Sequence, residues 1–311
     1  MKRIIAQIRL KYTIPLVCMV FMLTGCEKED ATVVDNSARM EISDEEKDNI
    51  FLAGFSPEGV IKTDGGYLVE GDIFLTAEDI EYQKELMYNT ITGTPSPEQY
   101  SSPFKVDVNG ATRTLKIKVD AGAQQTYFYN STEEAIARFN DLDLVLSFEL
   151  LDANATETPD ILIKGRQFDD GNVLGQSYGF PDADGNPAPR IDLSIDHYNP
   201  QTNRADFVTT IAHEIGHAIG FRHTDLHDRS QSCGQYISPW EALILRIQYG
   251  INNPYDETEL SPEEIPYHIT GTPTGADPQS DPSWMLACSD GTNRPFTPND
   301  LIAIKYLYPE L

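Results

Sequence analysis

Positive charge is scarce in this sequence. The chain has 311 residues, with 23 Lys and Arg against 49 Asp and Glu, and its formal net charge is −26. Nucleic acid binding requires clustered positive charge, so we do not expect a nucleic acid partner. An anionic membrane surface would repel the chain, so any membrane attachment must come from another feature of the sequence.

Long apolar runs are also missing. Residues 14–23 are apolar, but Pro15 interrupts them, and the run is shorter than the roughly 20 residues that a membrane-spanning helix needs. A basic segment precedes this run, with Lys2, Arg3, Arg9 and Lys11. A basic segment followed by a short apolar one is typical of an export signal.

The apolar run ends in Leu-Thr-Gly-Cys at residues 23–26, with small residues directly before Cys26. This pattern resembles the lipobox of bacterial lipoproteins, which implies that residues 1–25 are removed and that Cys26 is acylated. An ordinary secretory signal with an incidental cysteine is the alternative. The acidic residues 27–30 resemble a surface-export tag of some Gram-negative lineages, although a solvated tether also explains them. We therefore predict an exported protein, lipid-anchored to the bacterial outer membrane and exposed at the surface.

Cysteine is rare as well. The chain has four cysteines, and two of them, Cys233 and Cys288, lie beyond the signal and its lipobox. An exported chain reaches an oxidising compartment, so we expect these two to form a disulfide, with two buried free thiols as the alternative. Residues 1–25 hold four basic and no acidic residues, so the mature chain would keep 19 basic residues against 49 acidic ones.

Turn and linker signals divide the chain after the signal peptide. Residues 26–43 are polar and acidic and indicate a tether. Residues 44–103 alternate turn signals with short apolar runs, and we expect two strands around Gly71 and a helix over 77–88. They end in a segment rich in Pro, Ser, Thr and Gly at 92–103, which is the best candidate for a domain boundary.

Residues 104–311 predict an α+β domain. Strands are expected at 115–119, 144–151, 161–163, 177–180 and 191–195, and helix starts at Ser131, Asp206 and Thr297. After the second helix come about 75 residues with little periodicity, and the chain closes with the third helix. This order indicates a mixed, twisted sheet, one long helix and an irregular C-terminal subdomain that ends in a helix. We expect a monomer.

Three of the chain's six histidines, His213, His217 and His223, lie within eleven residues. The first two are four residues apart, so on a helix their imidazoles project from the same face. Gly220 permits the left-handed turn that would bring His223 back to them. Three protein ligands leave a fourth position on Zn²⁺ open for water, and Glu214 is placed to reach that water. The spacing predicts one catalytic zinc ion, whereas surface histidines at a helix end are the alternative.

The complete pattern H-E-x-x-H-x-x-G-x-x-H resembles the zinc motif of the metzincin metalloendopeptidases. The string HEIGH at residues 213–217 is similar to that of the bacterial dual-action HEIGH metallopeptidases. The resemblance implies a metzincin-like catalytic domain over residues 104–311 and a methionine turn beneath the metal, for which Met285 is the candidate. Astacin-type metzincins carry a tyrosine just after that methionine, but Leu286 stands here, so a tyrosine ligand is not expected.

The resemblance implies a zinc-dependent endopeptidase acting on a protein or peptide substrate. Zinc would activate a water molecule, and Glu214 would take its proton as general base. The substrate would lie along an edge strand, for which residues 175–180 are the candidate. Two alternatives stay open, namely a surface-binding lipoprotein with the same fold but no turnover, and a metal-dependent amidase that acts on the cell wall.

Residues 44–103 are either a latency segment or a permanent accessory module. No cysteine lies between Cys26 and the catalytic block, so a cysteine switch is excluded. The turn Glu70-Gly71-Asp72 resembles the Gly-Asp of an aspartate switch, which makes Asp72 a candidate latency switch; a plain β-turn is the alternative.

Two further patterns contain acidic residues. Residues 182–186, Asp-Ala-Asp-Gly-Asn, could place oxygen ligands around Ca²⁺, although a plain acidic turn explains them too. Asp225 follows the zinc motif closely, and it either makes local hydrogen bonds or holds a ligand histidine in place.

Overall fold

The computed structural model describes residues 40–57, 59–92, 101–225, 230–233, 269, 271–272 and 282–311. The expected signal peptide, Cys26 and residues 93–100 of the expected linker lie outside the described residues. In the described part of the chain, no helix is long and apolar enough to cross a membrane.

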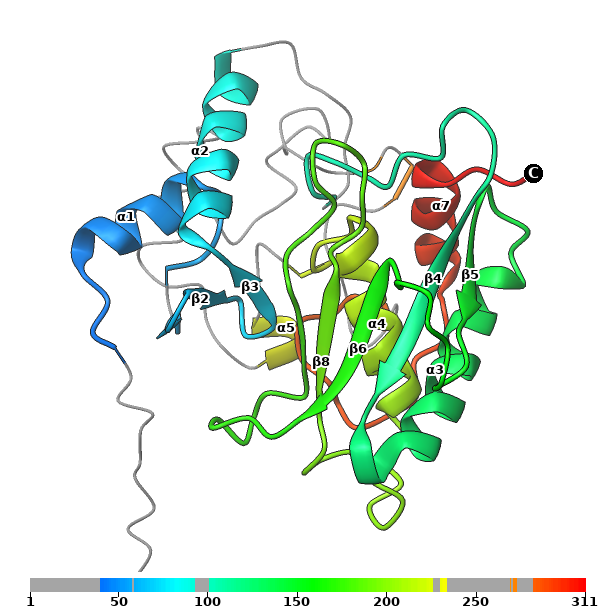
Figure 1. Cartoon of the computed structure of the whole chain (residues 1–311). Coiled ribbons are helices and arrows are strands. Elements are labelled where there is room, and N and C mark those ends of the chain that lie inside the picture. The colour runs from blue at the N-terminus through cyan, green and yellow to red at the C-terminus, as the bar shows by residue number, and fades with distance from the viewer. Residues whose placement is uncertain are drawn as a thin grey trace, which may run out of the picture. The chain divides into compact units, whose positions relative to one another are not determined.

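In these described residues, eight strands form one mixed sheet in the order β1-β2-β3-β7-β8-β6-β4-β5 (Figure 1). The strands are β1 (Ile61–Thr63), β2 (Gly66–Val69), β3 (Ile73–Leu75), β4 (Arg113–Asp120), β5 (Leu146–Leu150), β6 (Ile161–Arg166), β7 (Gly175–Ser177) and β8 (Arg190–Ser194). Strands β5, β4, β6 and β8 run parallel, and β7 is antiparallel to β8. The predicted α+β fold with a mixed sheet is confirmed.

Helices cover the sheet and carry the motif. They are α1 (Asp44–Leu52), α2 (Ala77–Thr92), α3 (Gln125–Asn140), α4 (Phe207–Ile219), α5 (Ser230–Cys233) and α7 (Pro298–Leu307). Helix α3 packs on β4 and β5, α4 packs on β7 and β8, and the two helices pack on each other (Figure 1). The main core lies between these helices and the sheet, because alternate residues of β4 (Leu115, Ile117 and Val119) are buried towards them.

The strands β1, β2 and β3 form an antiparallel meander that belongs to the same sheet. This meander and the helices α1 and α2 enclose a second, smaller core, made of Ile50, Ala53, Phe55, Val69, Ile73, Leu75 and Ile80. Residues 39–311 form one compact unit. The division at the 92–103 linker stays a prediction, while the sheet itself continues across the two blocks.

Strand β7 is not the edge of the sheet, so the expected edge strand at 175–180 is wrong in this respect. Strand β3 pairs with it in parallel, with Ile73 opposite Ser177. The Ser177 amide donates to the Asp72 carbonyl oxygen at 2.8 Å. Strand β3 of residues 44–103, here called the N-terminal block, therefore occupies the side of β7 that a substrate strand would need. Residues 104–311 are called the catalytic block.

One expected helix start differs from the structure, whereas the start expected at Asp206 agrees with it. Helix α3 begins at Gln125 rather than at Ser131, because Tyr127 and Phe128 already pack their rings on Phe207, with centroids 5.1 and 4.8 Å apart. Asp206 precedes α4 but makes no side-chain cap. Its carboxylate instead accepts hydrogen bonds from Arg204 at 2.8 Å and from Ser289 at 2.6 Å. The helix start expected at Thr297 is confirmed, since α7 begins at Pro298 and Thr297 forms a capping box with Asp300.

Candidate metal centre and catalytic cleft

Helix α4 carries the first two histidines and the glutamate of the motif. Its sequence is apolar, and almost all of its residues are buried. The helix ends at Gly220, whose φ of 114° lies in the left-handed region that favours glycine. The turn reverses the chain, so that His223 lies beside His213 and His217.

Backbone carbonyls orient the two helical imidazoles. His213 Nδ1 donates to the Trp284 carbonyl at 2.9 Å, and His217 Nδ1 donates to the Phe221 carbonyl at 2.8 Å. A carbonyl oxygen only accepts, so Nδ1 carries the hydrogen and Nε2 of the neutral ring keeps its lone pair. Burial lowers the pKa of His217 to about 4, so this ring is neutral at neutral pH. Both rings therefore present Nε2 as a metal ligand.

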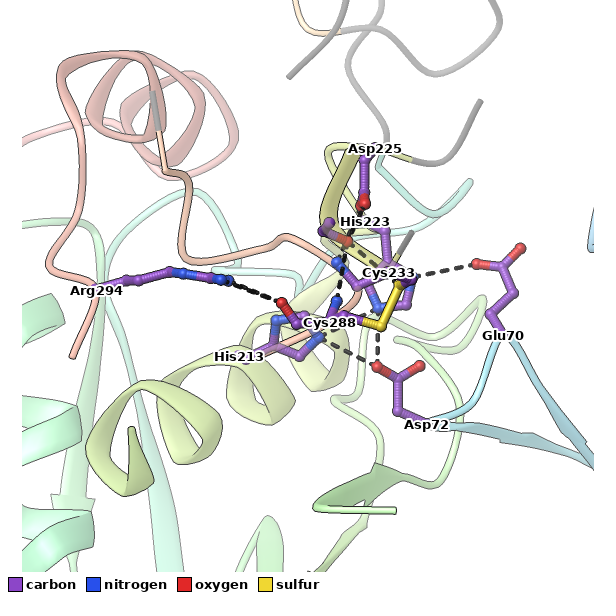
Figure 2. The surroundings of a disulfide bond; sticks show 10 residues. Glu70, Asp72, His213, His223, Asp225, Cys233, Cys288 and Arg294 are labelled. Atoms are coloured by element: carbon purple, nitrogen blue, oxygen red, sulfur yellow. Dashed lines mark hydrogen bonds and ion pairs between the residues drawn. A yellow bond between two sulfur atoms is a disulfide. The ribbon is translucent and has the colours of Figure 1, made fainter. Parts of the chain in front are cut away.

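The three Nε2 atoms and one carboxylate oxygen converge on a single point. His223 Nε2 lies 3.2 Å from Nε2 of His213 and 3.2 Å from Nε2 of His217. Asp72 Oδ2 lies 2.9, 3.3 and 3.7 Å from Nε2 of His223, His213 and His217 respectively (Figure 2). In the described residues, these four side chains are the group that could hold a metal ion.

The geometry and chemistry of this group fit Zn²⁺. Ligands about 2.0–2.1 Å from a tetrahedral zinc are about 3.3–3.4 Å from one another, close to the separations of these atoms. Neutral imidazoles with lone pairs that face one another repel unless a cation lies between them. Two buried carboxylates, Asp72 and Glu214, also lie here, and a divalent cation would balance their charge.

Glu214 is buried beside this group, with 2% of its surface exposed. In the described part of the chain its Oε2 has no hydrogen-bond partner. Strand β7 passes so close that a Cβ on Gly175 would lie 2.4 Å from Glu214 Oε1. Burial, and secondly the negative charge of Asp72, raises the pKa of Glu214 well above its ordinary value. The carboxylate therefore binds a proton more readily than an exposed glutamate does.

The turn around Met285 lies directly beneath the motif helix. Met285 and Trp284 are buried, and a Cβ on Gly216 would lie 2.6 Å from the sulfur of Met285 and 2.5 Å from the Trp284 ring. Ser283 anchors the turn by donating to Asp300 of α7 at 2.6 Å. The glycine in HEIGH thus lets the methionine turn approach the helix.

The structure joins Cys233 and Cys288 in a disulfide (Figure 2). Asp225 lies nearby, where its carboxylate accepts from the Ala287 amide at 2.9 Å and from the Ser232 hydroxyl. The Ala287 amide lies 62 residues along the chain from Asp225, so these contacts match neither the expected local hydrogen bonds nor the expected support of a ligand histidine. Together, the disulfide and Asp225 tie the segment after the third histidine to the methionine turn.

A cleft of about 530 Å³ runs beside His213 and Glu214. One wall is the turn of residues 70–72, and another consists of residues 170–175. The segment after the methionine turn, with Leu286 and Arg294, forms the opposite wall. The cleft is therefore shared between the N-terminal block and the catalytic block.

The acidic loop at residues 182–186 is a hydrogen-bonded turn. The Asn186 amide donates to Asp182 Oδ1 at 2.8 Å, and the Asn186 side chain donates to Oδ2 at 3.0 Å. Both carboxylate oxygens of Asp182 therefore already have donors. The metal-ligating group found in the described residues does not include this loop, so the plain turn is favoured over a Ca²⁺ site.

Two residues beside the metal centre were missed by the sequence analysis as functional candidates. Glu70 Oε2 lies 3.4 Å from His223 Nδ1, and Glu70 Oε1 lies 3.4 Å from Arg222 Nη2. Glu70 is about 150 residues away from these partners in the sequence. Arg222 directly precedes the third histidine, and this position is the one signal in the sequence that could have identified Arg222 as a candidate.

The fold and the centre define the class of the protein, which is a zinc metallopeptidase. The chain belongs to the dual-action HEIGH metallo-peptidase family, because the family's model matches residues 67–244, more than half of the chain. The resemblance that the motif indicated is confirmed. The matched region begins before Asp72 and includes all three histidines.

Several solved structures are similar to this chain. Two structures of myroilysin have TM-scores of 0.37 and 0.36 at 18% identity, and they cover 66% and 69% of this chain and 98% and 99% of their own. High choriolytic enzyme 1, a hatching enzyme zinc-protease from the medaka fish Oryzias latipes, has a TM-score of 0.34 at 16% identity. It covers 66% of this chain and 92% of its own. No curated protein matches the sequence.

Proposed function

We propose that this metallopeptidase is an endopeptidase in which His213, His217 and His223 hold zinc and Glu214 is the general base. The observation that carries the proposal is the convergence of three imidazoles beside a buried carboxylate, with Nε2 of His223 3.2 Å from Nε2 of each of the other two. Strand β7 would bind an extended substrate through its backbone, which requires no free chain end and so suits cleavage inside a polypeptide.

Each catalytic step uses a group already described. Zinc, when bound, acts as a Lewis acid that acidifies water and polarises the scissile carbonyl. Glu214 Oε2 accepts the proton of the attacking water, and the same carboxyl group then delivers it to the leaving amine. Burial and the negative charge of Asp72 raise the pKa of Glu214, which assists the first transfer because the carboxylate then accepts a proton more readily than an exposed glutamate does.

We propose further that residues 44–92 keep the enzyme latent, with Asp72 as the switch. Asp72 Oδ2 lies 2.9 Å from His223 Nε2, and Asp72 is the fourth member of the group that could hold the metal. Strand β3 pairs with β7, where a substrate strand would bind. Both the fourth metal position and the substrate edge are then covered by one turn and one strand of the same block.

A casein assay on the zinc-loaded full chain tests both proposals. Asp72→Asn removes a charged contact worth about 1.5–3 kcal/mol, so we expect about 10–100-fold more activity than in the parent chain. Asp72→Asn combined with Glu214→Gln should be inactive with unchanged zinc content. Asp64→Asn is the matched control, since Asp64 is an exposed residue of the same block.

Two results would contradict these proposals. Equal activity of the parent and Asp72→Asn chains would contradict the role of Asp72 as a latency switch. If neither chain cleaves casein or a peptide library, although both bind zinc, the endopeptidase is excluded and a surface-binding lipoprotein is favoured.

Export and lipid attachment rest on the sequence around Cys26, and we propose both on that basis. Mass spectrometry of the protein from bacterial membranes should find a chain that begins at an acylated Cys26. Cys26→Ala should leave the protein unprocessed or release it from the membrane. A mature chain that begins elsewhere and carries no lipid would contradict the anchor.

A further inference from the structure

The three histidines of the centre differ in what orients them. His213 and His217 each donate from Nδ1 to a backbone carbonyl, and both carbonyls belong to the catalytic block. His223 Nδ1 instead faces the carboxylate of Glu70, whose Oε2 is 3.4 Å away. This carboxylate comes from the turn between β2 and β3, in the N-terminal block (Figure 2).

Glu70 is held firmly in this position. Its side chain is 1% exposed, and its backbone has a φ of 57°, which is uncommon for a residue with a side chain. Arg222 Nη2 lies 3.4 Å from the other carboxylate oxygen and also donates to the Gly54 carbonyl at 2.8 Å. The Phe55 ring lies under the same guanidinium, 4.5 Å from its centroid. A buried carboxylate needs such a cationic partner, and here the pair fixes Glu70 against the third histidine.

We propose that Glu70 is a positioning residue for the metal centre. Its carboxylate lies 3.4 Å from His223 Nδ1, at ion-pair distance, and would accept the Nδ1 hydrogen when Nε2 binds the metal, which directs Nε2 at the metal. Carboxylates in this role raise the basicity of the ligating nitrogen and lock its tautomer. The proposal rests on the proposed zinc site and adds a residue to it.

The same turn then acts on both nitrogens of one imidazole. Asp72 approaches Nε2 of His223 and closes the metal's open position, while Glu70 supports Nδ1. The N-terminal block is thus an inhibitor of turnover that also strengthens metal retention. Opening the site at Asp72 should leave the support by Glu70 intact as long as the turn stays in place.

A double-mutant cycle on zinc affinity tests this role, with chelator competition on the full chain as the readout. Loss of such an outer partner typically weakens metal binding about 10–100-fold, which we expect for Glu70→Gln. The Asp72→Asn background decides the mechanism. If Glu70 acts through His223, Glu70→Gln weakens binding by a similar factor in that background; if it only holds Asp72 in place, the effect disappears and the proposal fails. Glu81→Gln, an exposed change in the same block, should have no effect.

Histidine NMR of the zinc-loaded chain gives a second readout that a general loss of stability would not produce. We expect Glu70→Gln to shift the Nδ1–H resonance of His223 and to leave those of His213 and His217 unchanged. If Glu70→Gln binds zinc with unchanged affinity and unchanged histidine resonances, the positioning role of Glu70 is contradicted, but the proposed zinc site is not. If the parent chain binds no zinc, the proposed function fails first.

Discussion

The N-terminal block and the catalytic block do not share one core, but both polar and aromatic contacts join them. Each block encloses its own cluster of buried apolar residues. Between them lie one parallel strand pair, β3 with β7, and a set of buried charged groups around Glu70, Asp72 and Arg222. The rings of Phe55 and Phe180 also stack across this boundary, with their centroids 6.3 Å apart. The catalytic block supplies the imidazoles and the guanidinium, and the N-terminal block supplies the carboxylates.

This difference suggests how the two blocks could separate. Parting the two blocks would expose the stacked rings of Phe55 and Phe180, while most residues of each core would keep their apolar neighbours. Parting the charged groups leaves Glu70, Asp72 and Arg222 without their partners, and such groups are costly when buried but not in water. The contacts around Glu70, Asp72 and Arg222, here called the joint, therefore hold the two blocks together strongly while they exclude water. Their contribution falls when water or a competing ligand enters.

The largest expected effect comes from removing an imidazole of the catalytic block. His217→Ala leaves two of three nitrogen ligands, so zinc affinity should fall by more than the roughly 100-fold that loss of an outer partner costs. Metal analysis after gel filtration should find the zinc lost and proteolysis absent. His197→Ala, which alters a histidine outside the centre, should keep its zinc. Full zinc content in His217→Ala would remove this residue from the ligand set.

The next largest effect should come from Arg222 in the joint. Arg222→Met leaves Glu70 buried without its guanidinium, and breaking a buried pair in this way costs about 3–5 kcal/mol of unfolding free energy. Urea denaturation measures it. The double variant Arg222→Met with Glu70→Gln should recover part of the loss, because no unpaired charge remains. A double variant less stable than Arg222→Met would show that the charge pair is not the cause.

A smaller effect is expected inside the catalytic block, away from the joint. Gly216→Ala would place a methyl group within 2.6 Å of Met285 and Trp284, and overpacking of this kind costs about 1–3 kcal/mol. Thermal denaturation should show a lower Tm for Gly216→Ala. The matched change Gly171→Ala faces open space and should leave Tm unchanged.

The smallest effect concerns Glu46 in the N-terminal block. A hydrogen bond from Lys62, followed by others from the Ser43 backbone and from Tyr67, lowers the pKa of Glu46 to about 2. Because the folded-state pKa is depressed, this stabilisation is present above pH 4.5 and is lost as pH falls towards 2.

Glu46→Gln should remove that pH dependence and cost about 0.2–1 kcal/mol, because the ion pair with Lys62 is lost while a glutamine can keep the capping box. Hydrogen exchange of the α1 amides at pH 6 and pH 3 measures both effects. The same pH response in the parent and variant chains would contradict this assignment.

The sequence predicted the features that depend on local spacing. His213, His217, Gly220 and His223 lie within eleven residues, and a helix followed by a left-handed turn is enough to bring them together. The capping box at Thr297 is equally local. The start of α3 was misplaced because the polar pattern at Ser131 outweighed the aromatic contacts of the preceding turn, which only the tertiary structure reveals.

The contacts between the blocks could not be predicted in this way. The pairing of β3 with β7 joins residues about 100 positions apart, and the contact of Glu70 with His223 spans about 150. Asp72 was singled out only through a family resemblance of two letters. Neither hydrophobic period nor spacing indicates which buried carboxylate meets which imidazole, because that depends on the packing of two separate cores.

Gly216 shows that the HEIGH string also carries a packing requirement. In the proposed function two of its five residues are ligands and one is the base, whereas the glycine lies against Met285 and Trp284. It is constrained from below, by a turn about 70 residues further along the chain. A random library built at this position should return glycine in a screen for folded protein, even where the histidines have already been replaced and no catalysis is selected.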